Sequence, residues 1–363
     1  MFNPFKRLAA DPSQRFYKSF NRLTDKDVLK IYPPTKGEVE VEGVTGFDSV
    51  VRLNSTYLEL VDRYYEWRGT KTLVAGGIFG IAFIGCFLIP LFQMVCSERI
   101  ELRGIIAMTV AWVIMVLPAS WISYKILICE FFFSTYYPIR FNRKNGMVYV
   151  YQAGGKVLAV PWREIRFVLY GEKSIRVKTW SILGCITAED GETVTGIIPL
   201  PVDLHWGPKS LDMYWEFIRC YMEEGDEYLP DLADTVPWCP PLEQQKEGWL
   251  FGLLYLCRQT GRLGLLLNLL QFPFLFAIAF SRWLVMLTCK IPQWPADIAT
   301  ACQIAENDPV NKGPEDNPPQ LWRPMLALQG KKRYAQTFAK ERGAMERIIA
   351  RLKAKYGEQG KED

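Results

Sequence analysis

Histidine is nearly absent from this chain of 363 residues, which holds only His205. A histidine that acts as general base or metal ligand usually needs a nearby nucleophile or further ligands at close spacing. The chain has no HExxH, GxSxG or SxxK pattern that would supply such partners. His205 is therefore interpreted as a turn residue. We predict a protein that is not an enzyme, with no catalytic residues and no metal, and a membrane enzyme is the least favoured alternative.

Phosphate-binding loops are missing as well, since neither GxxxxGK[ST] nor GxGxxG occurs. The two glycines before Lys156 join two predicted strands, so they indicate a hairpin turn, and no cofactor is predicted. The nine cysteines are scattered and form no CxxC pair. No disulfide framework or zinc site follows from this spacing, and a reducing cytosol fits best for the parts outside the membrane. The N-terminus lacks the continuous apolar core of a cleaved signal peptide.

Long apolar runs are the strongest positive feature of the sequence. Residues 73–95 carry no charge, and residues 104–128 carry only Lys125. A helix needs about 20 apolar residues to cross the hydrocarbon core of a bilayer. The short link 96–103 is polar and charged, so the range 71–128 predicts a transmembrane helical hairpin. The lipid bilayer is therefore the first predicted partner.

Lysine and arginine near the two apolar runs predict the orientation of the hairpin. Basic residues lie before the first run and after the second, whereas the link holds only Arg99 and Arg103. Because loops rich in Lys and Arg stay in the cytoplasm, we expect a multi-pass protein with its N-terminus and middle domain in the cytoplasm.

The later apolar zone, 249–290, is ambiguous. Its longest run, 263–280, contains Asn268, Gln271 and Pro273. It is interpreted either as a third, kinked span or as a bent segment in the cytoplasmic leaflet. The tail 291–363 is basic, which favours the second alternative because basic segments prefer the cytoplasm.

Glycines in the first apolar run form a small-xxx-small pattern, Gly76 and Gly80. This spacing lets two membrane helices approach closely. Packing against the second helix of the hairpin is the simpler interpretation, and a homodimer seam is the alternative.

Residues 129–225 read as a β domain. Asn145-Gly146 separates strands predicted at 137–141 and 147–151, and a second hairpin closes at Asp190-Gly191. Six or seven short antiparallel strands precede one helix predicted at 209–224. We therefore predict an α+β membrane protein, in which the transmembrane hairpin is followed by an antiparallel β-sandwich or barrel of pleckstrin-homology-like type with a C-terminal capping helix.

The remaining segments are predicted to surround this domain. Residues 1–70 are expected to be a cytoplasmic amphipathic lead-in, with one helix around 24–31 and another beginning near Asn54. Residues 226–248 read as an acidic, proline-rich linker. The tail is predicted to end in an amphipathic helix over 331–356.

Charge is unevenly distributed, with nine Lys/Arg between 140 and 178 and fourteen Asp/Glu between 188 and 247. Beside anionic lipid each basic residue gains roughly 1 kcal/mol, so the basic zone is a candidate membrane- or partner-facing surface, and the acidic zone could receive a basic protein. Solvated strand faces and a solvated linker are the simpler interpretations, and no nucleic-acid partner is expected. The candidates are Arg140, Arg143, Lys144, Lys156, Arg163 and Arg166 in the basic zone, and Glu223, Glu224, Asp226, Glu227 and Asp231 in the acidic zone.

Two resemblances extend this interpretation. The segments 137–143 and 160–165, placed after a transmembrane hairpin, resemble membrane-tethered bacterial pleckstrin-homology-like proteins. The segments 48–55, 138–143 and 215–219 are similar to those of an uncharacterised family of proteobacterial inner-membrane proteins. Members of that family are often encoded beside type VI secretion effectors. That similarity implies an immunity or accessory role through binding of a secreted toxin or secretion component. A membrane-surface scaffold or lipid-sensing module is the alternative.

Overall fold

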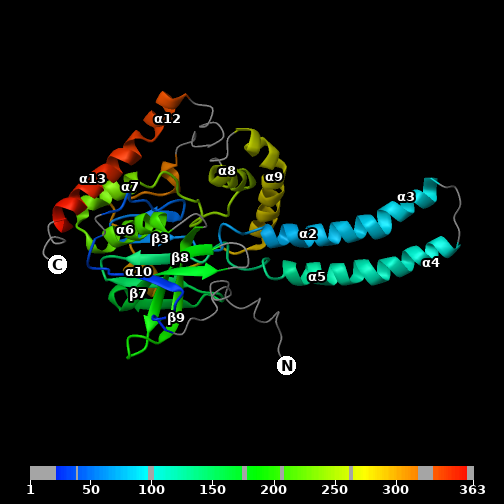
Figure 1. Ribbon diagram of the computed structural model, residues 1–363, viewed down its shortest axis with the longest axis horizontal. Helices are drawn as coiled ribbons and strands as arrows, with labels where there is room; N and C mark the ends of the chain where they lie inside the picture. Colours follow the sequence, from blue (N-terminus) through cyan, green and yellow to red (C-terminus); the bar gives the residue numbers. More distant parts are fainter. Residues whose placement is uncertain are drawn as a thin grey trace. The chain divides into compact units, whose positions relative to one another are not determined.

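The computed structural model describes residues 22–37, 40–96, 102–173, 178–204, 208–260, 265–317 and 330–357. His205 lies outside these residues. The chain divides into two compact units (Figure 1). The helical unit comprises Trp67–Phe133 and Glu247–Lys290. The sheet unit comprises 10–66, Ser134–Lys246 and Ile291–Asp363.

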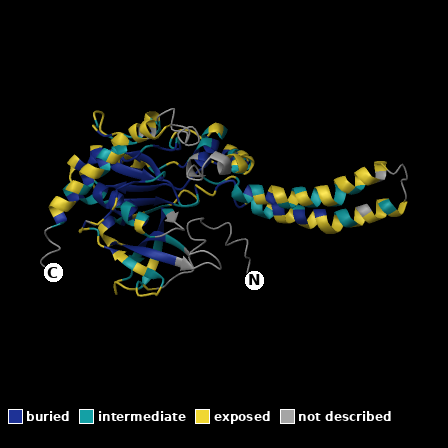
Figure 2. Ribbon diagram, turned by 45° about the horizontal axis from the view of Figure 1, so that its top comes forward, coloured by how far each residue is buried: buried dark blue, intermediate teal, exposed yellow. Residues whose placement is uncertain are grey.

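A long helical hairpin forms most of the helical unit, as the two apolar runs predict. Its outer surface is largely exposed (Figure 2), and both arms are long and apolar enough to cross a membrane. Each arm holds one short π-helical segment. The first arm is built from α2 (Thr70–Phe83), η2 (Ile84–Leu88) and α3 (Ile89–Cys96), and the second from α4 (Leu102–Ala111), η3 (Trp112–Val116) and α5 (Leu117–Leu127).

The two arms contact each other at Ala75, among other positions, and not at the glycine pair. The Ser123 hydroxyl donates a hydrogen bond to the Ala75 carbonyl oxygen, 2.8 Å away, and the Ala75 side chain is fully buried. A Cβ atom added at Gly76 or Gly80 would meet nothing within 4 Å. The interpretation that these glycines pack against the second helix is therefore wrong, because both lie away from the contact between the arms.

Two further helices complete the helical unit. They are α8 (Trp249–Thr260) and α9 (Leu265–Thr288), and α9 contains Pro273. The range Leu269–Thr288 also meets the length and composition of a membrane span. Arg282 of α9 is fully buried and forms an ion pair with Glu247, which precedes α8, at 2.6 Å. This pair joins the start of α8 to the last turns of α9.

Two antiparallel sheets form the sheet unit. One has the strand order β1-β7-β8-β9, and the other has the order β2-β3-β4-β5-β6. The six strands β4–β9 agree with the six or seven predicted after the hairpin. The strands are β1 (Val28–Tyr32), β2 (Val50–Leu53), β3 (Tyr57–Leu60), β4 (Ile139–Asn142), β5 (Met147–Tyr151), β6 (Val157–Pro161), β7 (Ile165–Lys173), β8 (Lys178–Thr187) and β9 (Val194–Leu204).

The predicted turns are confirmed, whereas the predicted N-terminal helices are wrong. Gly146 and Gly191 have φ angles of 68° and 70°, as tight hairpin turns require. The segment expected to be a lead-in instead supplies β1, β2 and β3. Asn54 lies in the β2–β3 turn, where its side-chain oxygen accepts hydrogen bonds from the amides of Thr56 and Tyr57.

An aromatic core joins the strands to α6 (Lys209–Glu223), the predicted helix after the last strand. Trp215 of α6 stacks on Trp162 with ring centroids 5.8 Å apart, and on Tyr32 of β1 at 5.2 Å. Phe167 of β7 packs against both tryptophans. The core therefore needs β1 from the N-terminal segment as well as the predicted β domain.

The segments predicted as linkers are folded. The acidic stretch forms a short helical turn and then α7, with Tyr228, Leu232 and Val236 buried. It is therefore part of the core and not a solvated linker. The tail helix is confirmed, as α13 with α12 before it. The bounds are η5 (Asp226–Tyr228), α7 (Leu229–Asp234), α10 (Ala296–Ala301), η6 (Pro314–Asp316), α12 (Lys331–Thr337) and α13 (Ala339–Tyr356).

Candidate functional site

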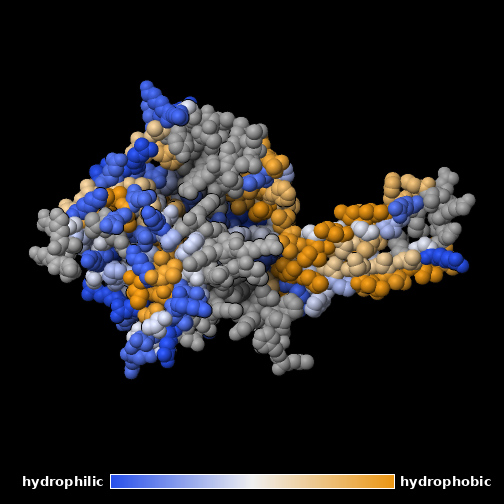
Figure 3. All heavy atoms as spheres, in the orientation of Figure 1, coloured by the Kyte–Doolittle hydropathy of each residue, from blue (hydrophilic) through white to orange (hydrophobic). Residues whose placement is uncertain are grey.

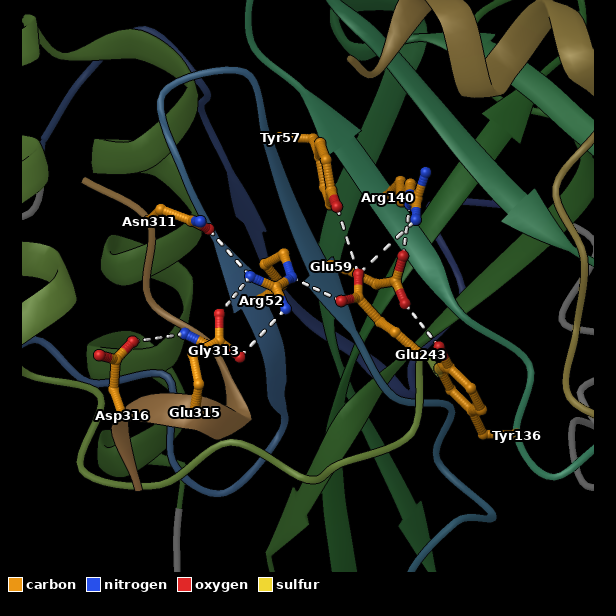
Figure 4. A network of polar contacts seen from close by, with 10 residues as sticks. All are labelled: Arg52, Tyr57, Glu59, Tyr136, Arg140, Glu243, Asn311, Gly313, Glu315 and Asp316. Carbon is orange, nitrogen blue, oxygen red and sulfur yellow. Dashed lines mark hydrogen bonds and ion pairs between the residues drawn. The ribbon is translucent and has the colours of Figure 1, made fainter. Parts of the chain in front are cut away.

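A buried network of charged side chains lies on the β2–β3–β4 face of the sheet unit (Figure 4). Glu59 of β3 and Arg140 of β4 are cross-strand partners, and their side chains form an ion pair. The Tyr136 hydroxyl donates a second hydrogen bond to Glu59, at 2.7 Å. Glu59 is fully buried, so its charge depends on these two donors.

Arg52 of β2 extends the network to two distant segments of the chain. Its Nε donates to Glu243 at 2.5 Å, and its Nη1 donates to Glu315 at 2.8 Å and to Asn311 at 2.9 Å. Tyr57 also donates to Glu243, at 3.2 Å. The network therefore fastens the segments around 243 and 311–316 to the sheet.

The charge of the buried Glu59 acts on Glu243, a second carboxylate of this network that is half-buried. Burial, followed by the charge of the neighbouring Glu59, raises the pKa of Glu243 above its usual range, although Arg52 opposes the shift. Burial in the same network raises the pKa of Tyr136. Each carboxylate also accepts from an arginine, so the arrangement is suited to holding segments together.

Arg140 belongs to this network and is removed from the basic surface predicted from the sequence. Its guanidinium lies 4.3 Å from the centre of the Tyr57 ring and 4.6 Å from that of the Trp294 ring. A buried guanidinium between two aromatic faces is stabilised by cation–π contact. Arg140 is therefore unavailable to a membrane or partner surface.

Arg143 and Asp226 bring the two predicted charged zones into contact with each other. The Arg143 Nη2 donates to the Glu224 carbonyl oxygen at 2.8 Å and lies 3.2 Å from the carboxylate of Asp226. Arg143 is mostly buried in this contact, whereas Asp226 is exposed. Glu227 is exposed too, and its backbone oxygen accepts from Arg351 at 2.9 Å.

Glu224 is buried and used by the chain itself. Its carboxylate accepts from Arg219 and Lys355, both at 2.7 Å, and from Tyr356 at 2.9 Å. Burial alone would raise the pKa of Glu224, but the hydrogen bonds from Lys355 and Arg219 outweigh burial and lower it. Two of these three donors belong to α13.

Asp231 fastens the same helix from the side of α7. It is buried and forms ion pairs with Arg347 at 2.6 Å and Arg351 at 2.9 Å. Glu223 is half-buried and accepts from the Trp162 indole nitrogen at 2.7 Å. Glu224 and Asp231 of the predicted acidic surface are thus used by the basic tail helix of the same chain, whereas Asp226 and Glu227 stay exposed.

Four of the predicted basic residues are exposed: Lys144, Lys156, Arg163 and Arg166. The two lysines lie in the β4–β5 and β5–β6 turns. The two arginines share one open pocket, at the point where β1 ends beside β7. This pocket, named here the β1 pocket, is lined by Ile31, Tyr32, Pro33, Pro34, Thr35, Arg163 and Arg166.

The floor of the β1 pocket is held firmly. The Tyr32 hydroxyl donates to Asp212 of α6 at 2.7 Å, and Lys30 pairs with the same carboxylate at 3.2 Å. The Tyr32 ring stacks on Trp215. Ile31 instead points outward, with about half of its surface exposed (51%). The pocket therefore combines a rigid aromatic floor, an exposed aliphatic side chain and two cations.

Sequence reasoning missed the buried network and the apolar half of the β1 pocket. Glu59 is a charge at the centre of an apolar strand, Tyr-Leu-Glu-Leu, and such a residue requires a buried partner. The sequence therefore indicates that Glu59 has a buried partner, but it does not identify Arg140 and Tyr136 as the partners. Within the described ranges, no three His, Cys, Asp or Glu side chains are grouped as a metal site would need.

A family model matches residues 109–306, slightly more than half of the chain, and it describes a family of unknown function, DUF6708. The chain belongs to the DUF6708 family. The match extends from the second arm of the hairpin to the residues after α10, so DUF6708 includes parts of both units. No curated protein and no solved structure matches the chain.

Proposed function

We propose that this DUF6708 protein is a non-enzymatic inner-membrane protein that binds a partner protein at the membrane surface. The hairpin would anchor it in the bacterial inner membrane, with the sheet unit in the cytoplasm. The partner would be a type VI secretion effector or a secretion component, so the protein would act as an immunity or accessory protein. Its resemblance to membrane proteins encoded beside such effectors supports this class of partner.

The β1 pocket carries the proposal. Protein interfaces are enriched in arginine and aromatic residues, and their strongest contacts combine an apolar centre with a polar rim. The β1 pocket has this composition, because the exposed Ile31 lines it together with Arg163 and Arg166. Leu29 of the same strand is also exposed, so the apolar surface continues along β1.

Charge identifies the kind of partner surface that would fit. Arg163 and Arg166 would attract carboxylates, and a guanidinium can bind a carboxylate through two hydrogen bonds. Glu224 and Asp231 of the predicted acidic surface already bind α13, and Glu223 binds Trp162, which makes the β1 pocket the better candidate. The expected partner surface is therefore acidic, with an apolar side chain at its centre.

Charge reversal in the β1 pocket tests the proposal. The double variant Arg163→Glu/Arg166→Glu is compared with Lys144→Glu/Lys156→Glu, which makes the same change of charge at two exposed turns outside the pocket. Each full chain is expressed in its native host, crosslinked and solubilised, and the co-purified proteins are quantified by mass spectrometry. We expect the amount of effector that co-purifies with the pocket variant to be at least about tenfold lower than with the native chain. Such a decrease corresponds to a binding free energy weaker by roughly 1.4 kcal/mol.

Equal recovery of the effector with both variants and the native chain would contradict the proposal, provided that all three chains unfold at the same temperature. Equal loss with both variants would also contradict it, because net charge and not the β1 pocket would then control binding.

The two exposed arginines also favour a second candidate, the membrane-surface scaffold or lipid-sensing module. In that case the β1 pocket would bind an anionic headgroup, and the sheet unit would be of pleckstrin-homology-like type. Two antiparallel sheets followed by α6 support that relationship. In the same experiment, recovery of anionic lipid without any effector, lost only in the pocket variant, would favour this second candidate.

A further inference from the structure

The last turns of α9 are fastened to the base of the α2–α5 hairpin. Gly69, immediately before α2, lies so close to the Arg282 backbone that an added Cβ would sit 2.4 Å from its nitrogen. The amide of Lys290 donates to the Phe133 carbonyl oxygen at 2.8 Å, and that of Phe132 donates to the Thr288 hydroxyl at 3.3 Å. These contacts fix one end of α9 where the hairpin begins and ends.

From this end, α9 runs across the hairpin and not along it. Figure 1 shows α9 at the base of the hairpin, with its axis transverse to the two long arms. Gly76, Gly77 and Gly80, farther along α2, meet no atom within 4 Å of an added Cβ. A third helix packed alongside α2 would approach such positions closely, so the structure does not have the form of a three-helix bundle.

The two faces of α9 differ in the way expected of a helix that lies at a membrane surface. The inner face is buried and includes Arg282, paired with Glu247. The outer face exposes large apolar side chains, and Figure 3 shows this hydrophobic surface meeting that of the hairpin. The exposed apolar residues of α9 are Leu269, Leu270, Phe272, Phe274, Phe276, Phe280 and Leu287.

The base of the hairpin carries further groups that suit the membrane interface. Trp67 and Phe132 are exposed beside the ends of α2 and α5, and Phe132 adopts a positive φ of 66° that is rare for a bulky residue. Aromatic side chains are enriched where hydrocarbon meets headgroups. A patch of this size facing water would be an aggregation hazard.

We propose that α9 lies in the plane of the membrane, with its outer face in the acyl chains of the leaflet that contains the hairpin base. The occupant of this face is lipid, because the face continues the apolar surface of the hairpin. The arrangement also keeps Arg282 on the side away from hydrocarbon, whereas a spanning α9 would carry its charge into the bilayer, which is unfavourable. The inference rests on the membrane location proposed above.

Depth measurements on the full chain separate an in-plane helix from a spanning one. A genetically encoded fluorescent residue is placed at Leu270, Phe280 or Leu287 of α9, one position per variant. Matched sites on the first arm are Val74, Ile81 and Phe92, and all six side chains are exposed. Each variant is reconstituted in phosphatidylcholine/phosphatidylglycerol vesicles that contain lipid labelled with a nitroxide at acyl carbon 5 or 12.

The first arm provides the calibration. Val74 and Phe92 are about 27 Å apart along an ideal helix, so the shallow quencher should act more strongly at both and the deep quencher more strongly at Ile81. For α9 we expect the shallow quencher to act more strongly at all three sites. Stronger deep quenching at Phe280 than at Leu270 and Leu287 would show a spanning α9 and overturn the inference, as would absence of quenching at all three. If the first arm is not quenched either, the membrane location itself fails.

Discussion

Glu59 is the fully buried carboxylate in the network of the sheet unit. It accepts from Arg140 and from Tyr136, and no part of its surface is exposed. Replacing one member of a buried ion pair leaves the other charge without compensation, which typically costs about 3–5 kcal/mol. We therefore expect Glu59→Gln to reduce the free energy of unfolding of the solubilised full chain by roughly that amount, measured by denaturant titration.

Glu315→Gln is the matched control, because it makes the same chemical change in the same network. The Glu315 side chain is 54% exposed and pairs with Arg52 at 2.8 Å. Exposed ion pairs contribute about 1 kcal/mol or less, so this variant should stay close to the native chain. Similar losses in the two variants would mean that burial of Glu59 does not determine its contribution.

At the scale of the element, α13 is held to the sheet unit by charge as well as by apolar packing. Ile348 and Leu352 are buried in the core, while Lys355 and Tyr356 donate to Glu224. Hydrogen bonds to a charged acceptor contribute about 1.5–3 kcal/mol. The docking of α13 should therefore depend on the protonation of Glu224.

The direction of this pH dependence follows from the lowered pKa of Glu224. Burial opposes ionisation of this carboxyl, but Lys355 and Arg219 outweigh it and bring the pKa below the ordinary value of 4.5. A carboxyl whose pKa is lowered in the folded state stabilises that state fully when the pH is above the pKa of the unfolded state. This contribution is lost as the pH falls through the pKa of the folded state. We expect the protection factors of the α13 amides, which compare hydrogen exchange with its intrinsic rate at each pH, to fall as pH decreases below about 4.5.

Glu224→Gln should remove part of this response, because the neutral side chain has no charge to lose. Glu346→Gln, on an exposed position of α13, is the control and should retain the native response. An unchanged acid response in Glu224→Gln would show that another group controls the docking of α13.

The elements that the sequence predicted correctly are those whose signals are local. Asn145-Gly146 allows a tight turn, and the length of two apolar runs indicates two helices long and apolar enough to cross a membrane. Asn54 misled the prediction because its side chain accepts backbone hydrogen bonds equally well at the start of a helix and in a strand turn.

The candidate site was predicted only in part, for a different reason. Arg163 and Arg166 were identified as basic candidates, but the apolar half of the β1 pocket comes from β1, more than a hundred residues earlier. Arg140 was placed on a surface because its partner Glu59 precedes the helical hairpin in the sequence, whereas Arg140 follows it. Pairings between distant segments have no local pattern, so composition and spacing did not reveal them.

At the scale of the whole molecule, the sheet unit is assembled from three separate stretches of the chain. The strands β1–β3 and the helix α13, which lie outside the predicted β domain, add eight residues to its central core. Burial of each large apolar side chain contributes about 1.5–3 kcal/mol, which amounts to roughly 12–24 kcal/mol for eight. Whole domains are typically stable by only about 5–15 kcal/mol. The eight residues are Tyr32, Val50, Leu53, Leu58, Leu60, Ile348, Leu352 and Tyr356.

The predicted β domain should therefore not fold alone. We expect residues 131–225, produced as a fragment, to show no cooperative thermal transition and poor dispersion in proton NMR spectra. A chain that retains 22–66, 134–246 and 291–357, with flexible glycine-serine linkers replacing the helical unit, should unfold cooperatively in water. Asp62 accepts a hydrogen bond from the Tyr137 amide at 2.8 Å, so the first linker has little distance to bridge. Cooperative unfolding of the 131–225 fragment would show that β1–β3 and α13 are dispensable, and the sheet unit would then be smaller than its contacts indicate.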